Sequence, residues 1–97
     1  MPEGYLYILK CSDGSYYTGS TKDLDRRMEQ HQNGVGAIYT KRRLPIELIY
    51  SEVFPKIDEA FFREKQVQGW SRKKKEAYMQ GRLKDIQTLS RSKNSGD

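Results

Sequence analysis

The chain has 97 residues, which is long enough for one small domain with a modest core and too short for two. Charged residues make up 32% of it and hydrophobic residues 35%, so the core must be compact and much of the surface must be ionic. Its 18 lysines and arginines exceed its 13 acidic residues and give a net charge of +5, and basic domains often bind polyanions such as nucleic acids.

The expected location of the protein follows from what the sequence lacks. No apolar run approaches the roughly 20 residues of a membrane span, and the N-terminus has no apolar region typical of a signal peptide. The single cysteine, Cys11, cannot form an internal disulfide, which fits a reducing compartment. We therefore expect a cytoplasmic protein with no membrane partner.

Two tyrosine-rich segments, residues 5–10 and 16–20, flank the turn sequence Ser-Asp-Gly-Ser and are predicted to form a β-hairpin. The turn can close in two ways. A two-residue loop would send Tyr7 and Tyr17 to opposite faces of the sheet, because side chains alternate along a strand. A three-residue loop, with Gly14 in the left-handed region, would place both tyrosines on one face. The sequence permits both turns, and only the second brings the two phenols together.

A helix is predicted from Asp23 to Asn33, with Asp23 as its N-cap and Gly34 as its C-cap. Arg27 and His31 are four residues apart in this helix. Side chains at this spacing lie one above the other on the helix surface.

The following segment, residues 33–45, contains two glycines and a basic cluster and is predicted to be a loop. A third strand is expected over residues 46–54, with Ile46 and Tyr50 on the same face because they are an even number of residues apart.

Residues 58–80 are predicted to be helical, and Gly69 is expected to mark a break or a close-packing point within them. The resulting order is β-β-α-β-α-α, an α+β fold in which a small three-stranded antiparallel sheet is flanked by helices. Residues 1–81 are expected to form the domain. Residues 82–97 are expected to add a short C-terminal helix and a frayed tail, and no separate domain.

Two sequence triplets carry a resemblance to a known family. Tyr5-Leu6-Tyr7 and Tyr17-Thr18-Gly19 are similar to the two triplets that give the GIY-YIG nuclease family its name, with a tyrosine at the first glycine position. The resemblance covers about residues 3–80. It is closest to the stand-alone, single-domain bacterial members of the family, whose biological role is generally left open.

Two later segments extend the resemblance. GSTKDLDRRMEQH resembles the helix motif of the family, with Arg27 and His31 in its R-x-x-x-H spacing. EAFFREKQVQGWSRKKKEA resembles the later acidic helix of the family, with Glu64 at the metal-ligand position.

The resemblance implies a set of catalytic roles. Hydrolysis of a phosphodiester needs an activated water, neutralisation of charge on the phosphate and help for the leaving oxygen. Tyr7 would act as the general base or relay the proton, Tyr17 would position water or phosphate, and His31 would share in proton transfer. Arg27 would bind phosphate, and its charge is expected to lower the pKa of the Tyr7 phenol from about 10. Glu64 would bind one Mg²⁺ or Mn²⁺, since magnesium keeps most of its waters and needs few protein carboxylates.

Two basic runs, at residues 41–43 and 72–75, would bind phosphate without sequence preference. An aromatic side chain beside the first run could stack on an unpaired base, which contributes about 1–3 kcal/mol. Trp70 is expected to close the core, and Glu52 is expected to be structural. The residues predicted to contact nucleic acid are Tyr39, Lys41, Arg42, Arg43, Arg72, Lys73 and Lys74.

The resemblance therefore implies a metal-dependent endonuclease that hydrolyses phosphodiester bonds in DNA, of the kind used in repair or recombination. The alternative is a nucleic-acid-binding module with weak or no catalytic activity, which would use the same basic surface. A third interpretation, a protein-interaction adaptor, has no direct support in the sequence.

Overall fold

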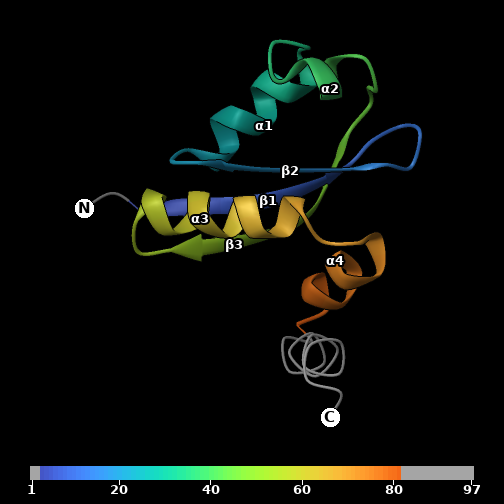
Figure 1. The fold of residues 1–97 in the computed structure, drawn as a ribbon. Coiled ribbons are helices and arrows are strands. Elements are labelled where there is room, and N and C mark those ends of the chain that lie inside the picture. Colours follow the sequence, from blue (N-terminus) through green and yellow to red (C-terminus); the bar gives the residue numbers. More distant parts are fainter. Residues whose placement is uncertain (1–2, 82–97) are drawn as a thin grey trace.

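A computed structural model describes residues 3–81 of the protein (Figure 1). One antiparallel sheet with strand order β2-β1-β3 carries helices on both of its faces, so the predicted α+β class and three-stranded sheet are confirmed. None of the helices within residues 3–81 is long and apolar enough to cross a membrane. The predicted last helix and tail, residues 82–97, lie outside the described residues. In chain order the elements are β1 (Gly4–Lys10), β2 (Tyr16–Thr21), α1 (Leu24–Gln32), α2 (Ile38–Lys41), β3 (Glu47–Phe54), α3 (Ile57–Gln68) and α4 (Arg72–Met79).

The turn between β1 and β2 is the three-residue one. Gly14 has a φ of 85°, in the left-handed region that favours glycine. The Cys11 N–H donates to the carbonyl of Ser15 at 2.8 Å, which closes the loop. Tyr7 consequently lies opposite Gly19, and it shares one face of the sheet with Tyr17.

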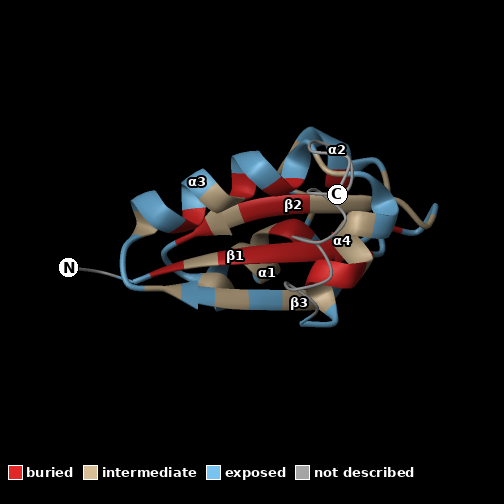
Figure 2. Ribbon diagram, turned by 60° about the horizontal axis from the view of Figure 1, so that its bottom comes forward, coloured by how far each residue is buried: buried red, intermediate tan, exposed pale blue. Residues whose placement is uncertain are grey.

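The central strand β1 is buried on both of its faces (Figure 2). One face packs against α1, and the other packs against α3 and α4. This alternation places the two tyrosines under α1. The core under α1 contains Tyr7, Leu9, Cys11 and Ile46 with Leu24 and Met28. The core under α3 and α4 contains Leu6, Ile8, Val67, Ala77 and Tyr78.

The predicted helix ends are largely confirmed. The Asp23 side chain caps α1 by accepting a hydrogen bond from the N–H of Arg26 at 3.1 Å. Gly34, which follows the last residue of the cap, has a φ of 75°. The second helical region does break near Gly69. Ser71 is the N-cap of the next helix, α4, and its side chain accepts a hydrogen bond from the N–H of Lys74.

Two sequence expectations are wrong. The segment predicted to be a loop contains the short helix α2, in which Thr40 is buried. The pairing of β1 with β3 shifts register between Ile8 and Leu9, so Ile46 packs under α1 whereas Tyr50 packs under α3 and α4. A bulge of this kind reverses the alternation of side chains along a strand, and the sequence pattern does not reveal it.

Glu52 and Trp70 are both structural, as expected. The carboxylate of Glu52 accepts hydrogen bonds from Tyr50, at 3.0 Å, and from Tyr78. Trp70 contacts the ring of Tyr78 edge-on at a centroid distance of 5.4 Å. Both residues therefore belong to the face of the sheet that lies away from the two paired tyrosines.

Candidate active site

Three aromatic rings meet beneath α1. The Tyr7 and His31 rings are 5.6 Å apart, and the Tyr17 ring lies 5.6 Å from His31 and 6.4 Å from Tyr7. The Tyr7 hydroxyl and Nε2 of His31 form a hydrogen bond of 2.9 Å. Tyr7 and His31 are fully buried, and Tyr17 is partly exposed. The hairpin and the helix thus bring together three of the residues predicted to be catalytic.

Two glycines make room for these rings. A Cβ at Gly19 would lie 2.4 Å from the Tyr7 hydroxyl oxygen, and a Cβ at Gly36 would lie 2.4 Å from Nδ1 of His31. Real Cβ atoms do not approach other atoms this closely. Any residue other than glycine at position 19 would therefore collide with the phenol, and any other residue at position 36 would collide with the imidazole. Sequence reasoning identified Gly19 only as part of a triplet and did not identify Gly36.

His31 has a second buried partner that the sequence analysis missed. Its Nδ1 lies 2.9 Å from Oγ1 of Thr40, which itself donates a hydrogen bond to the carbonyl of Ala37 at 3.0 Å. Thr40 is fully buried. A polar side chain within a segment that reads as a solvent-exposed loop gives no sequence signal for this contact.

Burial controls the protonation of the central pair. Burial and the neighbouring Tyr17 raise the pKa of Tyr7 to about 12, and the positive charge of Arg27 opposes this rise without reversing it. Arg27 does act in the expected direction and lowers the pKa of the phenol, but desolvation is the larger effect, so the pKa of Tyr7 rises overall. Burial and Arg27 both lower the pKa of His31 from 6.5, which keeps the imidazole neutral at pH 7.

Arg27 projects from α1 beside the rings and is partly exposed. Its charge acts on Tyr7, Tyr17 and His31 alike. Within residues 3–81 its guanidinium is in no ion pair with a carboxylate. Its donors can therefore bind the oxygens of an incoming phosphate, for which the planar guanidinium is well suited.

Glu64 approaches from the other face of the sheet, on α3. Its two carboxylate oxygens accept hydrogen bonds from the Ser20 hydroxyl at 2.5 Å and from the Gln68 amide at 2.7 Å. Its charge also helps to raise the pKa values of Tyr7 and Tyr17, after the larger effect of burial. Since Ser20 lies on the edge strand β2, Glu64 lies beside this edge of the sheet.

The carboxylate oxygens of Glu64 are suitable ligands for one hard divalent cation that has few other ligands from the protein. Each carboxylate oxygen retains a lone pair beyond the hydrogen bond that it accepts. Residues 3–81 contain no group of three or more His, Cys, Asp or Glu side chains that could hold a metal ion. An ion at Glu64 would therefore take most of its ligands from water and substrate, which is the arrangement that Mg²⁺ tolerates best.

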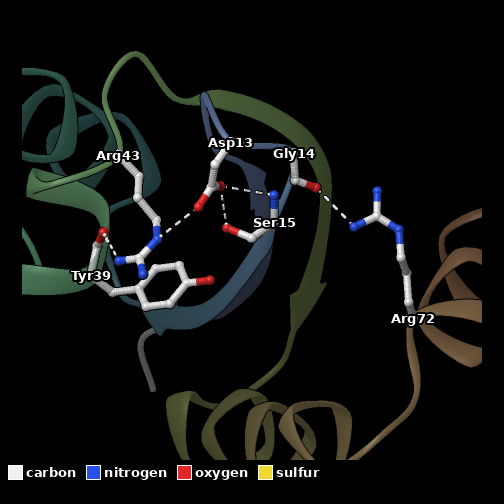
Figure 3. Close-up of polar contacts among 6 residues, drawn as sticks. All are labelled: Asp13, Gly14, Ser15, Tyr39, Arg43 and Arg72. Atoms are coloured by element: carbon white, nitrogen blue, oxygen red, sulfur yellow. Dashed lines mark hydrogen bonds and ion pairs between the residues drawn. The ribbon is translucent and has the colours of Figure 1, made fainter.

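Two of the arginines predicted to bind nucleic acid make contacts within the protein, on either side of the hairpin turn (Figure 3). Arg43 forms an ion pair of 3.0 Å with Asp13 and donates to the carbonyl of Tyr39. Arg72 donates to the carbonyl of Gly14 at 2.8 Å. These contacts hold the turn whose geometry places Tyr7 and Tyr17 together.

The other predicted nucleic-acid contacts differ in their surroundings. The Tyr39 ring stacks on Tyr17 at 5.9 Å, and the guanidinium of Arg43 lies 3.8 Å from its centre, so a base that stacked there would have to displace a neighbour. The ammonium of Lys74 lies 4.7 Å from the centre of the Trp70 ring. The remaining three side chains are exposed, and binding of nucleic acid by this set stays a prediction. They are Lys41, Arg42 and Lys73.

Comparisons with known proteins identify relatives of the chain. Residues 3–77 match the model of the GIY-YIG catalytic domain. The chain is 49% identical over 75 residues to UPF0213 protein SSP2268 of Staphylococcus saprophyticus, covering 77% of this chain and 92% of that protein. It is 47% identical over 76 residues to a UPF0213 protein of Bacillus pumilus, with 78% of each chain covered.

Two solution NMR structures are also similar to the chain. UPF0213 protein BH0048 from Bacillus halodurans is 47% identical with a TM-score of 0.52, over 78% of this chain and 81% of that one. Protein EF2693 from E. faecalis is 39% identical with a TM-score of 0.59, over 84% of this chain and 86% of that one.

Proposed function

Because the chain belongs to the GIY-YIG family, we propose that it is a metal-dependent endonuclease that hydrolyses phosphodiester bonds in DNA, of the kind used in repair or recombination. The observation that carries this proposal is the hydrogen bond between the Tyr7 hydroxyl and Nε2 of His31. It joins a candidate proton donor to a base that is neutral at pH 7, beside an arginine able to bind phosphate.

Proton transfer through the pair explains how a tyrosine of high pKa can serve as a base. With a pKa of about 12, full ionisation of Tyr7 at pH 7 would cost about 7 kcal/mol. That cost is avoided if Tyr7 passes its proton to Nε2 of His31 while it accepts one from the attacking water. The water oxygen then forms the new bond to phosphorus as the bond from phosphorus to the leaving oxygen breaks.

The other residues act on the phosphate. Arg27 binds nonbridging oxygens and offsets the charge that develops on them. Glu64 would hold the Mg²⁺ or Mn²⁺, which supplies Lewis-acid stabilisation of the leaving oxygen when bound. Since the Tyr7 side chain is fully buried, substrate binding has to open access to its hydroxyl. Tyr17, which contacts both buried rings and is partly exposed, is the side chain whose displacement would do so.

A cleavage assay tests this function. Labelled single-stranded, duplex, flapped and branched DNA, and matched RNA, are incubated with the protein and Mg²⁺ or Mn²⁺. Tyr7→Phe should lower the rate about 10²- to 10⁴-fold, and Glu64→Ala should abolish the metal-dependent cleavage. Tyr16→Phe and Glu59→Ala are matched controls, since Tyr16 lies in the same hairpin on the other face and Glu59 is exposed on the same helix. Cleavage that persists undiminished in both active-site variants would contradict the mechanism.

The full burial of Tyr7 and His31 favours a second candidate, a nucleic-acid-binding module with weak or no cleavage. The cleavage assay, run beside a binding measurement over a range of salt concentrations, separates it from the first. Both candidates predict affinity that falls steeply with salt, because phosphate contacts release counterions. Binding without cleavage on every substrate would support the second candidate.

A further inference from the structure

The hydrogen bonds around His31 form a continuous buried chain. It runs from the Tyr7 hydroxyl to Nε2, from Nδ1 to the Thr40 hydroxyl, and from that hydroxyl to the Ala37 carbonyl. A hydroxyl has one proton to donate, and a carbonyl can only accept. If Thr40 donates to Ala37, it must accept from His31, so the imidazole proton lies on Nδ1. Nε2 then has a free lone pair, which accepts the Tyr7 proton.

The opposite arrangement of protons leaves a group unsatisfied. With the proton on Nε2, the imidazole would donate to the Tyr7 oxygen, and Thr40 would turn to donate to Nδ1. The Ala37 carbonyl would still have a hydrogen bond, because it also accepts from the N–H of Lys41 at 3.0 Å. The Tyr7 proton, however, would lose its acceptor, because among residues 3–81 the Tyr7 hydroxyl is hydrogen-bonded to Nε2 of His31, and the neighbouring Arg27 can only donate. An unsatisfied buried donor costs about 1–3 kcal/mol.

The fold holds Thr40 in place for this contact. Thr40 lies in α2 and is fully buried, and Gly36 brings the backbone so close to Nδ1 that a Cβ there would lie 2.4 Å away. The segment from Gly36 to Thr40 therefore encloses the side of the imidazole that faces away from Tyr7.

We propose that Thr40 is a positioning residue for the reaction, and that it fixes His31 in the tautomer with the proton on Nδ1. Nε2 is thereby kept as an acceptor for Tyr7. The role of Thr40 in catalysis rests on the proposed nuclease function, whereas the tautomer does not. The two can therefore be tested separately.

The tautomer is measured by ¹⁵N NMR of the imidazole in the full chain. His31 is the only histidine in the sequence, so its two nitrogen signals need no assignment against others once any affinity tag has been removed. In the wild-type protein at neutral pH, Nδ1 should give the signal of a protonated nitrogen and Nε2 that of an unprotonated one. A wild-type spectrum with the proton on Nε2 overturns the proposal, whatever the behaviour of any variant.

Three variants test the role of the hydroxyl. Thr40→Val has the same shape without the hydroxyl and should shift the tautomer population toward protonated Nε2. It should also lower kcat about 10- to 100-fold, as is typical of residues that orient a reacting group, with KM little changed. Thr40→Ser should restore both properties. Thr18→Val is a matched control, because the buried Oγ1 of Thr18 has no hydrogen-bond partner among residues 3–81.

The outcomes separate the two proposals. An Nδ1-protonated spectrum that is unchanged in Thr40→Val contradicts the role of Thr40. An Nδ1-protonated wild type that shifts as expected in Thr40→Val, but cleaves no substrate, contradicts the nuclease function and leaves the structural role of Thr40 standing.

Discussion

Gly19→Ala should damage the site through a single methyl group. Its Cβ would lie 2.4 Å from the Tyr7 hydroxyl oxygen and 2.5 Å from the ring carbon that bears it. Relief to an ordinary contact requires a shift of about 1 Å, which breaks the 2.9 Å hydrogen bond to His31. Gly19 is not in the left-handed region, so this steric effect stands alone.

The expected cost follows from two effects. Overpacking of a core costs about 1–3 kcal/mol, and leaving the buried Tyr7 donor without its acceptor costs a further 1–3 kcal/mol or so. The free energy of unfolding should therefore fall by about 2–6 kcal/mol. Displacement of the reacting phenol by about 1 Å should also lower the rate of cleavage on the order of 10²-fold.

Urea unfolding followed by circular dichroism measures the first quantity, and the cleavage assay measures the second. Gly69→Ala is the control, since its Cβ would meet its nearest neighbour at 3.6 Å, an ordinary contact, and its φ is −84°. That variant should change the free energy of unfolding by less than about 1 kcal/mol. If Gly19→Ala unfolds at the same urea concentration as Gly69→Ala and cleaves at the wild-type rate, the reasoning about the phenol is refuted.

The pH dependence and the Glu52 cluster give two further predictions. The folded state lowers the pKa of His31 below its usual 6.5, so as the pH falls below 6.5 the unfolded chain takes up a proton that the folded protein resists. The free energy of unfolding should fall by up to about 1.4 kcal/mol per pH unit from pH 6.5 down to the lowered pKa of folded His31. Cleavage should fall at lower pH, around that lowered pKa, as the folded imidazole is protonated. A His31→Gln variant with an identical stability profile would contradict this. Glu52→Ala removes the acceptor of the Tyr50 and Tyr78 hydroxyls. It should lower the free energy of unfolding by about 2–4 kcal/mol. The rate constant of the folded enzyme should stay unchanged, because the cluster lies on the other face of the sheet. Loss of activity without loss of stability would contradict that separation.

The elements of the fold were largely predictable because their signals are local. Asp23 as an N-cap, the Asp-Gly turn and the break near Gly69 depend on the chemistry of neighbouring residues. The type of the turn was not predictable, since both loops suit the same four residues. The three-residue loop lets Tyr7 lie over Gly19, and Arg43 supports it from 30 residues away. The sequence alone does not show that support.

The candidate site was likewise predictable only in part. Spacing in the sequence indicated Tyr7, Tyr17 and His31, and the structure brings all three together. Thr40 was missed because its burial depends on how α2 folds back onto α1. The effect of Arg27 on the pKa of Tyr7 was predicted with the right sign, because a neighbouring charge can be read from spacing, whereas the larger effect of desolvation cannot.

The position of β2 at the edge of the sheet constrains how a substrate can approach. Arg27 belongs to α1, which covers one face of the sheet, and Glu64 belongs to α3, which covers the other and contacts Ser20 of this strand. A phosphate that contacts both residues cannot rest on either face of the sheet. It would have to cross the outer edge of β2, which has no further strand beside it within the described residues.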